Sequence, residues 1–146
     1  MNGMDDLVQF LRARLDEDES VARAVEDGSA PFDGQWKADG DTALRTENDH
    51  VLAYLPEGRP FKVGVLRHIA RHDPARILRE VEAKRRIVQE ILKYEAKIDS
   101  EWGCCHLMNE IADGLCSERS PASIPALQLL AVSYADHPDY REEWRP

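Results

Sequence analysis

The sequence predicts a single, mostly helical domain with a small antiparallel β element, an α+β fold arranged around one long central helix. Apolar residues recur at three- and four-residue steps over residues 74–98, and no Gly or Pro follows Pro74 within that stretch. Runs typical of short strands are confined to residues 32–60, where Gly and Pro form turns. The length of 146 residues suits one domain, residues 1–146.

The first predicted helix covers residues 7–25. Asp5 or Asp6 can cap it, because a side-chain carboxylate accepts hydrogen bonds from the unpaired N–H groups of a first helical turn. The apolar residues that fall on one side of this helix are Leu7, Leu11, Leu15, Ala22 and Val25. We expect that side to face the core.

Three candidate strands follow, at residues 35–38, 42–46 and 51–55. The last is the clearest, because its apolar run is closed by Pro56 and Gly58. Together they predict a small antiparallel sheet that packs against the helices, with Trp36 as its anchor.

The start of the central helix is predicted from the pair Asp73-Pro74. Asp is a preferred N-cap residue, and Pro suits the first helical position, where its missing N–H has no intrahelical partner in any case. The helix is therefore expected over residues 74–98. At about 1.5 Å per residue, it is long enough for the other elements to pack along it.

The C-terminal part predicts one more helix and an aromatic tail. Pro121 and Pro125 mark a restart, and apolar residues over 124–132 describe a short buried helix. Tyr140 and Trp144 then lie four residues apart. We expect this tail to dock on its own domain.

Charge is distributed unevenly along this acidic chain, whose formal net charge is −9. Residues 1–60 carry 6 basic and 14 acidic side chains, residues 61–98 carry 10 and 5, and residues 99–146 carry 3 and 9. In one interpretation the acidic flanks neutralise the basic central helix in modest surface pairs. In the other, the helix exposes a stripe for phosphate or an acidic partner, formed by Arg79, Lys84, Arg85, Arg86 and Lys93. Because the net charge repels polyanions, we do not expect nucleic-acid binding.

Four consecutive acidic residues lie within the first predicted helix, namely Asp16, Glu17, Asp18 and Glu19. Consecutive helical residues point about 100° apart, so these carboxylates cannot converge on one metal ion. One interpretation is a solvated helix face. The other is an interaction site that binds a basic surface of a protein partner, as nucleic-acid mimics do.

His68 and His72 form a first candidate metal site. Their spacing of four residues places two imidazoles on one helix face, as zinc requires, and Asp73 adds a carboxylate. The metalloprotease motif is incomplete, because Ile69 stands where that motif has Glu. Two interpretations stay open: structural hydrogen bonds at a helix junction, or a metal-dependent hydrolase that uses His68, His72 and Asp73.

The cysteine segment is a second candidate metal site, with Cys104, His106 and Cys116 as ligands and Cys105 as a substitute for Cys104. Thiolates and imidazole suit zinc, but structural zinc sites separate paired cysteines by about two to four residues, and here two are adjacent. The segment is therefore a zinc-stabilised interaction module, a set of ordinary thiols or a redox site. A structural disulfide is not expected in a cytoplasm.

The sequence contains no complete catalytic motif. It lacks a Gly-x-Ser-x-Gly elbow, a phosphate-binding Gly-rich loop and a Rossmann fingerprint. No apolar run approaches the roughly 18 residues of a membrane span, and the N-terminus has no signal-peptide pattern. We therefore expect a cytoplasmic, non-enzymatic binding or regulatory protein with a protein partner, no cofactor apart from zinc in the metal-site interpretations, and no membrane contact.

Three stretches carry a resemblance to a known family. They are residues 4–19 (MDDLVQFLRARLDEDE), 68–87 (HIARHDPARILREVEAKRRI) and 134–146 (YADHPDYREEWRP), about a third of the chain. Together they resemble an uncharacterised family of actinobacteria and their phages that is classed as a domain of unknown function. The resemblance implies a cytoplasmic protein that mobile elements often carry, and it implies no activity.

Overall fold

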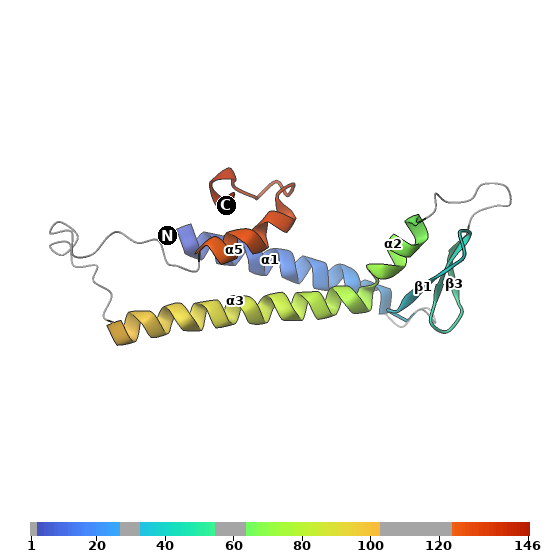
Figure 1. The fold of residues 1–146 in the computed structure, drawn as a ribbon, viewed down its shortest axis with the longest axis horizontal. Coiled ribbons are helices and arrows are strands. Elements are labelled where there is room, and N and C mark those ends of the chain that lie inside the picture. The colour runs from blue at the N-terminus through green and yellow to red at the C-terminus, as the bar shows by residue number, and fades with distance from the viewer. Residues whose placement is uncertain (1–2, 27–32, 55–63, 103–123) are drawn as a thin grey trace. The chain divides into compact units, whose positions relative to one another are not determined.

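The structure of the chain is a computed structural model that describes residues 3–26, 33–54, 64–102 and 124–146. These residues form a mostly helical fold with a small antiparallel sheet, which confirms the predicted fold class (Figure 1). They divide into two compact units, one of residues 1–14 and 84–146 and one of residues 15–83. The single domain over residues 1–146 stays a prediction.

Three predicted helices are present. They are α1 (Gly3–Arg23), which continues as the 3-10 turn η1 (Ala24–Glu26), α3 (Pro74–Trp102), and α5 (Ile124–Ala131), which the 3-10 turn η2 (Val132–Tyr134) follows. α1 begins four residues before the predicted residue 7, so the prediction that Asp5 or Asp6 caps it is wrong: both lie inside its first turn, where a negative charge is also favourable. α3 begins at the predicted residue and ends later than residue 98, because no Gly or Pro interrupts the sequence before Gly103. None of the described helices combines the length and the apolar composition that crossing a membrane requires.

One short helix, α2 (Val65–Arg71), is not among the helices that the sequence analysis predicts. It has seven residues and follows Gly64, whose φ of 98° lies in the left-handed region and which provides no side-chain cap. A helix of this length shows no clear periodicity, and without a capping side chain it has no start signal in the sequence.

The sheet consists of three antiparallel strands in the order β1-β2-β3, with the bounds Trp36–Asp39, Ala43–Thr46 and Val51–Tyr54. The predicted strands are therefore confirmed to within one residue at each end. Trp36 pairs with Thr46 at one end of the β1–β2 ladder. The β2–β3 register shifts between Leu44 and Arg45, which marks a bulge in this pair.

The turn between β2 and β3 is closed by a buried polar side chain. Thr46 is fully buried, and its Oγ1 accepts a hydrogen bond from the His50 backbone N–H at 3.1 Å. Asp49, within this turn, adopts a φ of 66°, a left-handed conformation that Asp tolerates better than most residues. The Thr46 hydroxyl therefore satisfies a backbone donor that the turn would otherwise leave unpaired.

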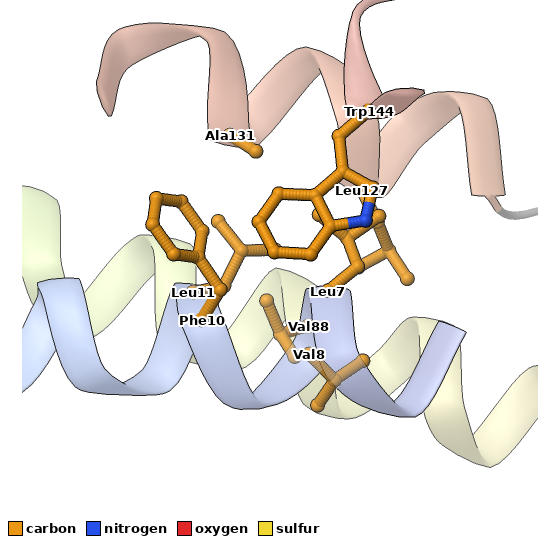
Figure 2. Close-up of a cluster of buried hydrophobic side chains, with 8 residues drawn as sticks. All are labelled: Leu7, Val8, Phe10, Leu11, Val88, Leu127, Ala131 and Trp144. Carbon is orange, nitrogen blue, oxygen red and sulfur yellow. The ribbon is translucent and has the colours of Figure 1, made fainter. Parts of the chain in front are cut away.

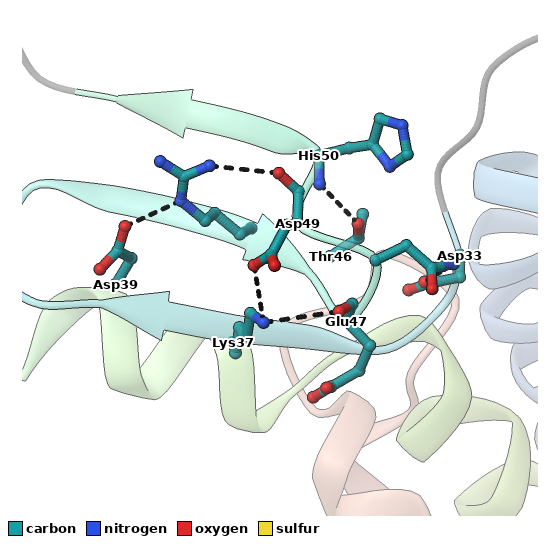
Figure 3. A network of polar contacts seen from close by, with 9 residues as sticks. Asp33, Lys37, Asp39, Thr46, Glu47, Asp49 and His50 are labelled. Carbon is teal, nitrogen blue, oxygen red and sulfur yellow. Dashed lines mark hydrogen bonds and ion pairs between the residues drawn. The ribbon is translucent and has the colours of Figure 1, made fainter.

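Charged side chains of the sheet pair with one another (Figure 3). Lys37 Nζ lies 2.8 Å from a carboxylate oxygen of Asp49, and Arg45 Nε lies 2.8 Å from one of Asp39. The hydrogen bond between Lys37 and Asp49 raises the pKa of the lysine and lowers the pKa of the aspartate. Since these pairs are solvent-exposed, they contribute little to stability and mainly neutralise the charge of the sheet.

The core of the unit of residues 1–14 and 84–146 joins α1, α3 and α5 to the C-terminal tail. Its buried side chains are Leu7, Val8, Phe10, Leu11, Val88, Leu127, Ala131 and Trp144 (Figure 2). Trp144, in the 3-10 turn η3 (Glu142–Trp144), is only 5% exposed, and its ring centroid lies 5.0 Å from that of Phe10. The prediction that the aromatic tail docks on its own chain is confirmed.

Polar contacts also hold the tail on α1. An Arg141 guanidinium nitrogen lies 2.8 Å from the Asp6 carboxylate, and the guanidinium covers the Trp144 ring at 5.1 Å. Further along α1, the largely buried Arg14 contacts both ring nitrogens of His137. These contacts place Asp6 in an ion pair with the tail, in addition to its position in the first turn of α1.

In the unit of residues 15–83, the Asp73 carboxylate joins α3 to the sheet. Its Oδ1 accepts from the Arg76 backbone N–H at 2.7 Å, which confirms the predicted N-cap. Its Oδ2 accepts from the Trp36 backbone N–H at 3.3 Å. A neighbouring bond runs from the Ala75 N–H to the Gly34 carbonyl oxygen at 2.9 Å. The start of β1 is therefore held against the first turn of α3.

We predict that Asp73→Ala lowers the free energy of unfolding by about 1 to 2 kcal/mol, because it leaves two backbone donors without their acceptor. Asp73→Asn keeps one acceptor oxygen and loses the charge that favours a helix N-terminus, so its loss should be smaller, below about 1 kcal/mol. Urea melts of both variants measure these differences. Equal, negligible shifts for Ala and Asn would show that Asp73 does not cap α3.

Candidate functional site

A pocket of about 290 Å³ lies in the unit of residues 15–83, between the end of α1, the start of β1 and the junction of α2 and α3. Its lining residues are Asp18, Val21, Ala22, Val25, Trp36, His72, Pro74 and Ile77. Most of them are apolar, and they are joined by one carboxylate and one imidazole. Ligand pockets usually span roughly 300–1,000 Å³, so this one fits a single bulky side chain or a small molecule.

The α1 wall of the pocket follows from helix periodicity. Asp18, Val21, Ala22 and Val25 are three or four residues apart and therefore share one face of the helix and its 3-10 extension. Ala22 is buried, whereas Val21 is 68% exposed. Val21 therefore forms a solvent-exposed apolar rim of the pocket.

Trp36 is held in the pocket wall by hydrogen bonds at both of its N–H groups. Its backbone N–H donates to Asp73, and its indole Nε1–H donates to the Asp33 carbonyl oxygen at 3.2 Å. The Asp33 carboxylate in turn accepts from the Gln35 backbone N–H at 3.1 Å and from the Asn48 side chain at 2.8 Å. These bonds fix the indole that lines the pocket.

The four acidic residues of α1 separate into different environments. Asp16 and Glu17 are exposed, Asp18 lines the pocket, and Glu19 pairs with Arg23 at 2.7 Å across one helical turn. The expected divergence of consecutive helical side chains is therefore seen. Whether this face binds a partner stays a prediction.

His68 and His72 lie close together, as their spacing predicts, with ring centroids 4.5 Å apart. His72 Nδ1 lies 2.9 Å from the His68 carbonyl oxygen, a structural bond of the kind that one of the two interpretations expects. The nearby Asp73 directs both carboxylate oxygens at backbone N–H groups. Only His72 of these three residues lines the pocket.

The structure describes the residues of only one of the two predicted metal sites, His68 and His72. Cys104, His106 and Cys116 lie outside the described residues. Within residues 3–26, 33–54, 64–102 and 124–146, no three His, Cys, Asp or Glu side chains come together in a way that suits a metal ion. Both metal sites remain predictions.

Two basic residues of the central helix pair with acidic residues of the same helix. Arg76 Nε lies 2.6 Å from the Glu80 carboxylate, and Lys93 Nζ lies 2.7 Å from that of Glu90. Lys84 lies over the Tyr134 ring, 5.5 Å from its centroid. These contacts favour the interpretation in which surface pairs neutralise the charge of this helix.

The pocket as a whole was missed by sequence reasoning. Its lining residues come from α1 and its 3-10 extension, the start of β1 and the junction of α2 and α3, so no local motif contains it. Two of its residues are candidate functional residues in the sequence analysis, Asp18 as part of the acidic run and His72 as a metal ligand. The sequence contains only an indirect indication of the pocket, which is that the apolar Val21 falls on the side of α1 that also carries acidic residues.

The comparisons with known proteins identify a family and no activity. The sequence model of a family of unknown function, DUF6221, matches residues 4–146. No curated protein and no solved structure matches the chain. Since the match spans nearly the whole sequence, this chain belongs to that family of unknown function.

Proposed function

We propose that the protein is a non-enzymatic binding or regulatory protein that binds a basic protein partner through the acidic face of α1. One observation carries the proposal: Asp16 and Glu17 are exposed, and the adjacent Asp18 lines an apolar pocket. Charges beside an apolar site increase the rate at which an oppositely charged partner associates and set its orientation. The partner would therefore present Lys or Arg at its contact surface.

The negative net charge of the chain supports a positively charged partner. The net charge is −9, and residues 1–60 hold 14 acidic side chains against 6 basic ones. Exposed charges are screened beyond about 8 Å at physiological ionic strength, so binding should weaken as salt increases. We place this interaction in the cytoplasm, with neither nucleic acid nor a membrane as the partner.

We predict that reversing the charge of the exposed acids weakens partner binding. The amount of partner captured by the variant Asp16→Lys/Glu17→Lys should be about tenfold lower than with wild type, or lower still, because two attractive charges become repulsive. The matched control is Asp136→Lys/Glu143→Lys, which reverses two exposed acids in the tail. Affinity capture from the natural host, quantified by mass spectrometry, compares the three proteins.

Two outcomes of this capture would contradict the proposal. One is equal loss of the partner in both charge-reversed variants, since the effect would then come from net charge and not from α1. The other is that nothing is retained above background while the purified protein turns over a metabolite.

A second candidate function is metal-dependent hydrolysis, and one observation favours it. The His68 and His72 rings are 4.5 Å apart, which is close enough for both imidazoles to bind one ion. Asp73 would have to exchange its two backbone hydrogen bonds for the metal. In the related zinc-stabilised module, Cys104, His106 and Cys116 would hold the ion instead.

Elemental analysis of protein purified without chelator tests both metal sites. If the histidine pair binds metal, we predict about one equivalent, which His72→Ala removes and which the control His50→Ala, in the sheet turn, leaves in place. Loss only in Cys116→Ser would assign the metal to the cysteine segment. A metal-free preparation would count against both sites.

A further inference from the structure

We infer that the pocket in residues 15–83 binds one bulky apolar side chain, such as Leu, of a peptide segment that carries Lys or Arg next to it. The inference rests on the proposed function for the charge of the partner. It adds the site at which the partner is anchored and the kind of residue that enters it.

The chemistry of the pocket lining favours an apolar side chain. Val25, Trp36, Pro74 and Ile77 contribute carbon surface from separate parts of the fold, and Val21 extends that surface to the rim. Filling such a pocket with an apolar group removes both surfaces from water, which is the main favourable contribution to binding. A charged group placed there would lose its hydration and meet few polar partners.

The size of the pocket suits one bulky side chain. At about 290 Å³ it lies just below the usual range for small-molecule sites, which extends to roughly 1,000 Å³. A single Leu or Phe anchor with neighbouring residues outside the pocket is the arrangement in which short segments bind grooves.

The polar residues of the wall determine which residues suit the positions beside the anchor. Among the described residues that line the pocket, Asp18 contributes the only carboxylate. Glu17 precedes Val21 by four residues, which places an exposed second carboxylate one helical turn from the apolar rim. The other polar group, His72, has its Nδ1 directed at the His68 carbonyl oxygen. A Lys or Arg on either side of the anchor therefore meets negative charge on the α1 side.

Hydrogen bonds within the chain hold the pocket wall in place without a ligand. Trp36 is held through Asp73 and Asp33, and the Ile77 backbone N–H donates to the Asp73 carbonyl oxygen at 3.0 Å. A preformed wall lowers the cost of ordering on binding, because the side chains that contact the ligand are already fixed.

Nitrogen-15 NMR titration of the full chain with three blocked tripeptides tests the inference. The probes are acetyl-Lys-Leu-Lys-amide, acetyl-Lys-Ser-Lys-amide, which lacks the anchor, and acetyl-Glu-Leu-Glu-amide, which reverses the charge. We expect the first to shift the Trp36 indole N–H and the Ala22 and Ile77 amides saturably, while the serine peptide leaves them unchanged and the glutamate peptide binds more weakly.

Two conservative variants test the role of charge. Asp18→Asn should weaken the Lys-Leu-Lys peptide by about two- to fivefold, as expected for one partly exposed ion pair. The same substitution should not lower the affinity for the Glu-Leu-Glu peptide. Asp41→Asn, an exposed acid in the turn after β1, is the matched control and should change neither affinity. The same spectra report whether each variant is folded.

The remaining outcomes separate this inference from the proposed function. If both lysine peptides shift only the Asp16 and Glu17 amides, the acidic face binds cations as proposed and the pocket inference is wrong. If the lysine and glutamate peptides shift the pocket signals equally, the pocket has no charge preference, which overturns the inference and removes support for a basic partner. An absence of any shift at millimolar peptide also overturns it.

Discussion

Within residues 15–83, the arrangement of helix and sheet depends on how a single carboxylate is shared. Asp73 accepts from the Arg76 N–H at 2.7 Å, and it accepts from the Trp36 N–H at 3.3 Å. The shorter bond is the stronger one and is set locally by the helix start, whereas the longer one joins residues that are far apart in the sequence. An amide left unpaired in a partly buried position costs about 1–3 kcal/mol, so both elements are held to Asp73.

The pocket is built largely from the neighbours of this carboxylate. His72 and Pro74 flank Asp73 in the chain, Trp36 donates to its side chain, and Ile77 donates to its carbonyl oxygen. Among the described lining residues, these four are therefore positioned around Asp73, and α1 with its 3-10 extension supplies the others. The cap of α3 also fixes the proposed binding surface, which links the stability of this unit to the proposed binding activity.

Local chemistry explains which features were predictable. The cap at Asp73 and the bounds of β1 to β3 follow from backbone preferences that a few neighbouring residues determine. The proximity of His68 and His72 likewise follows from their spacing. The short helix α2 lacks a cap and a clear period, and the pocket needs contacts between residues as distant as Asp18 and Ile77. Sequence patterns describe individual elements, whereas a site made from several elements depends on long-range packing.

Amide hydrogen exchange at Trp36 and Arg76 tests most directly whether one carboxylate holds the sheet to the central helix. If it does, Asp73→Ala should speed exchange at both amides by about tenfold or more, whereas the amide of Leu11, in the core of the other unit, should be unchanged. In Asp73→Asn at least one of the two amides should remain protected, because one acceptor oxygen remains. Unchanged protection of Trp36 in Asp73→Ala would contradict the shared-carboxylate link, because β1 would then be held to α3 by other contacts.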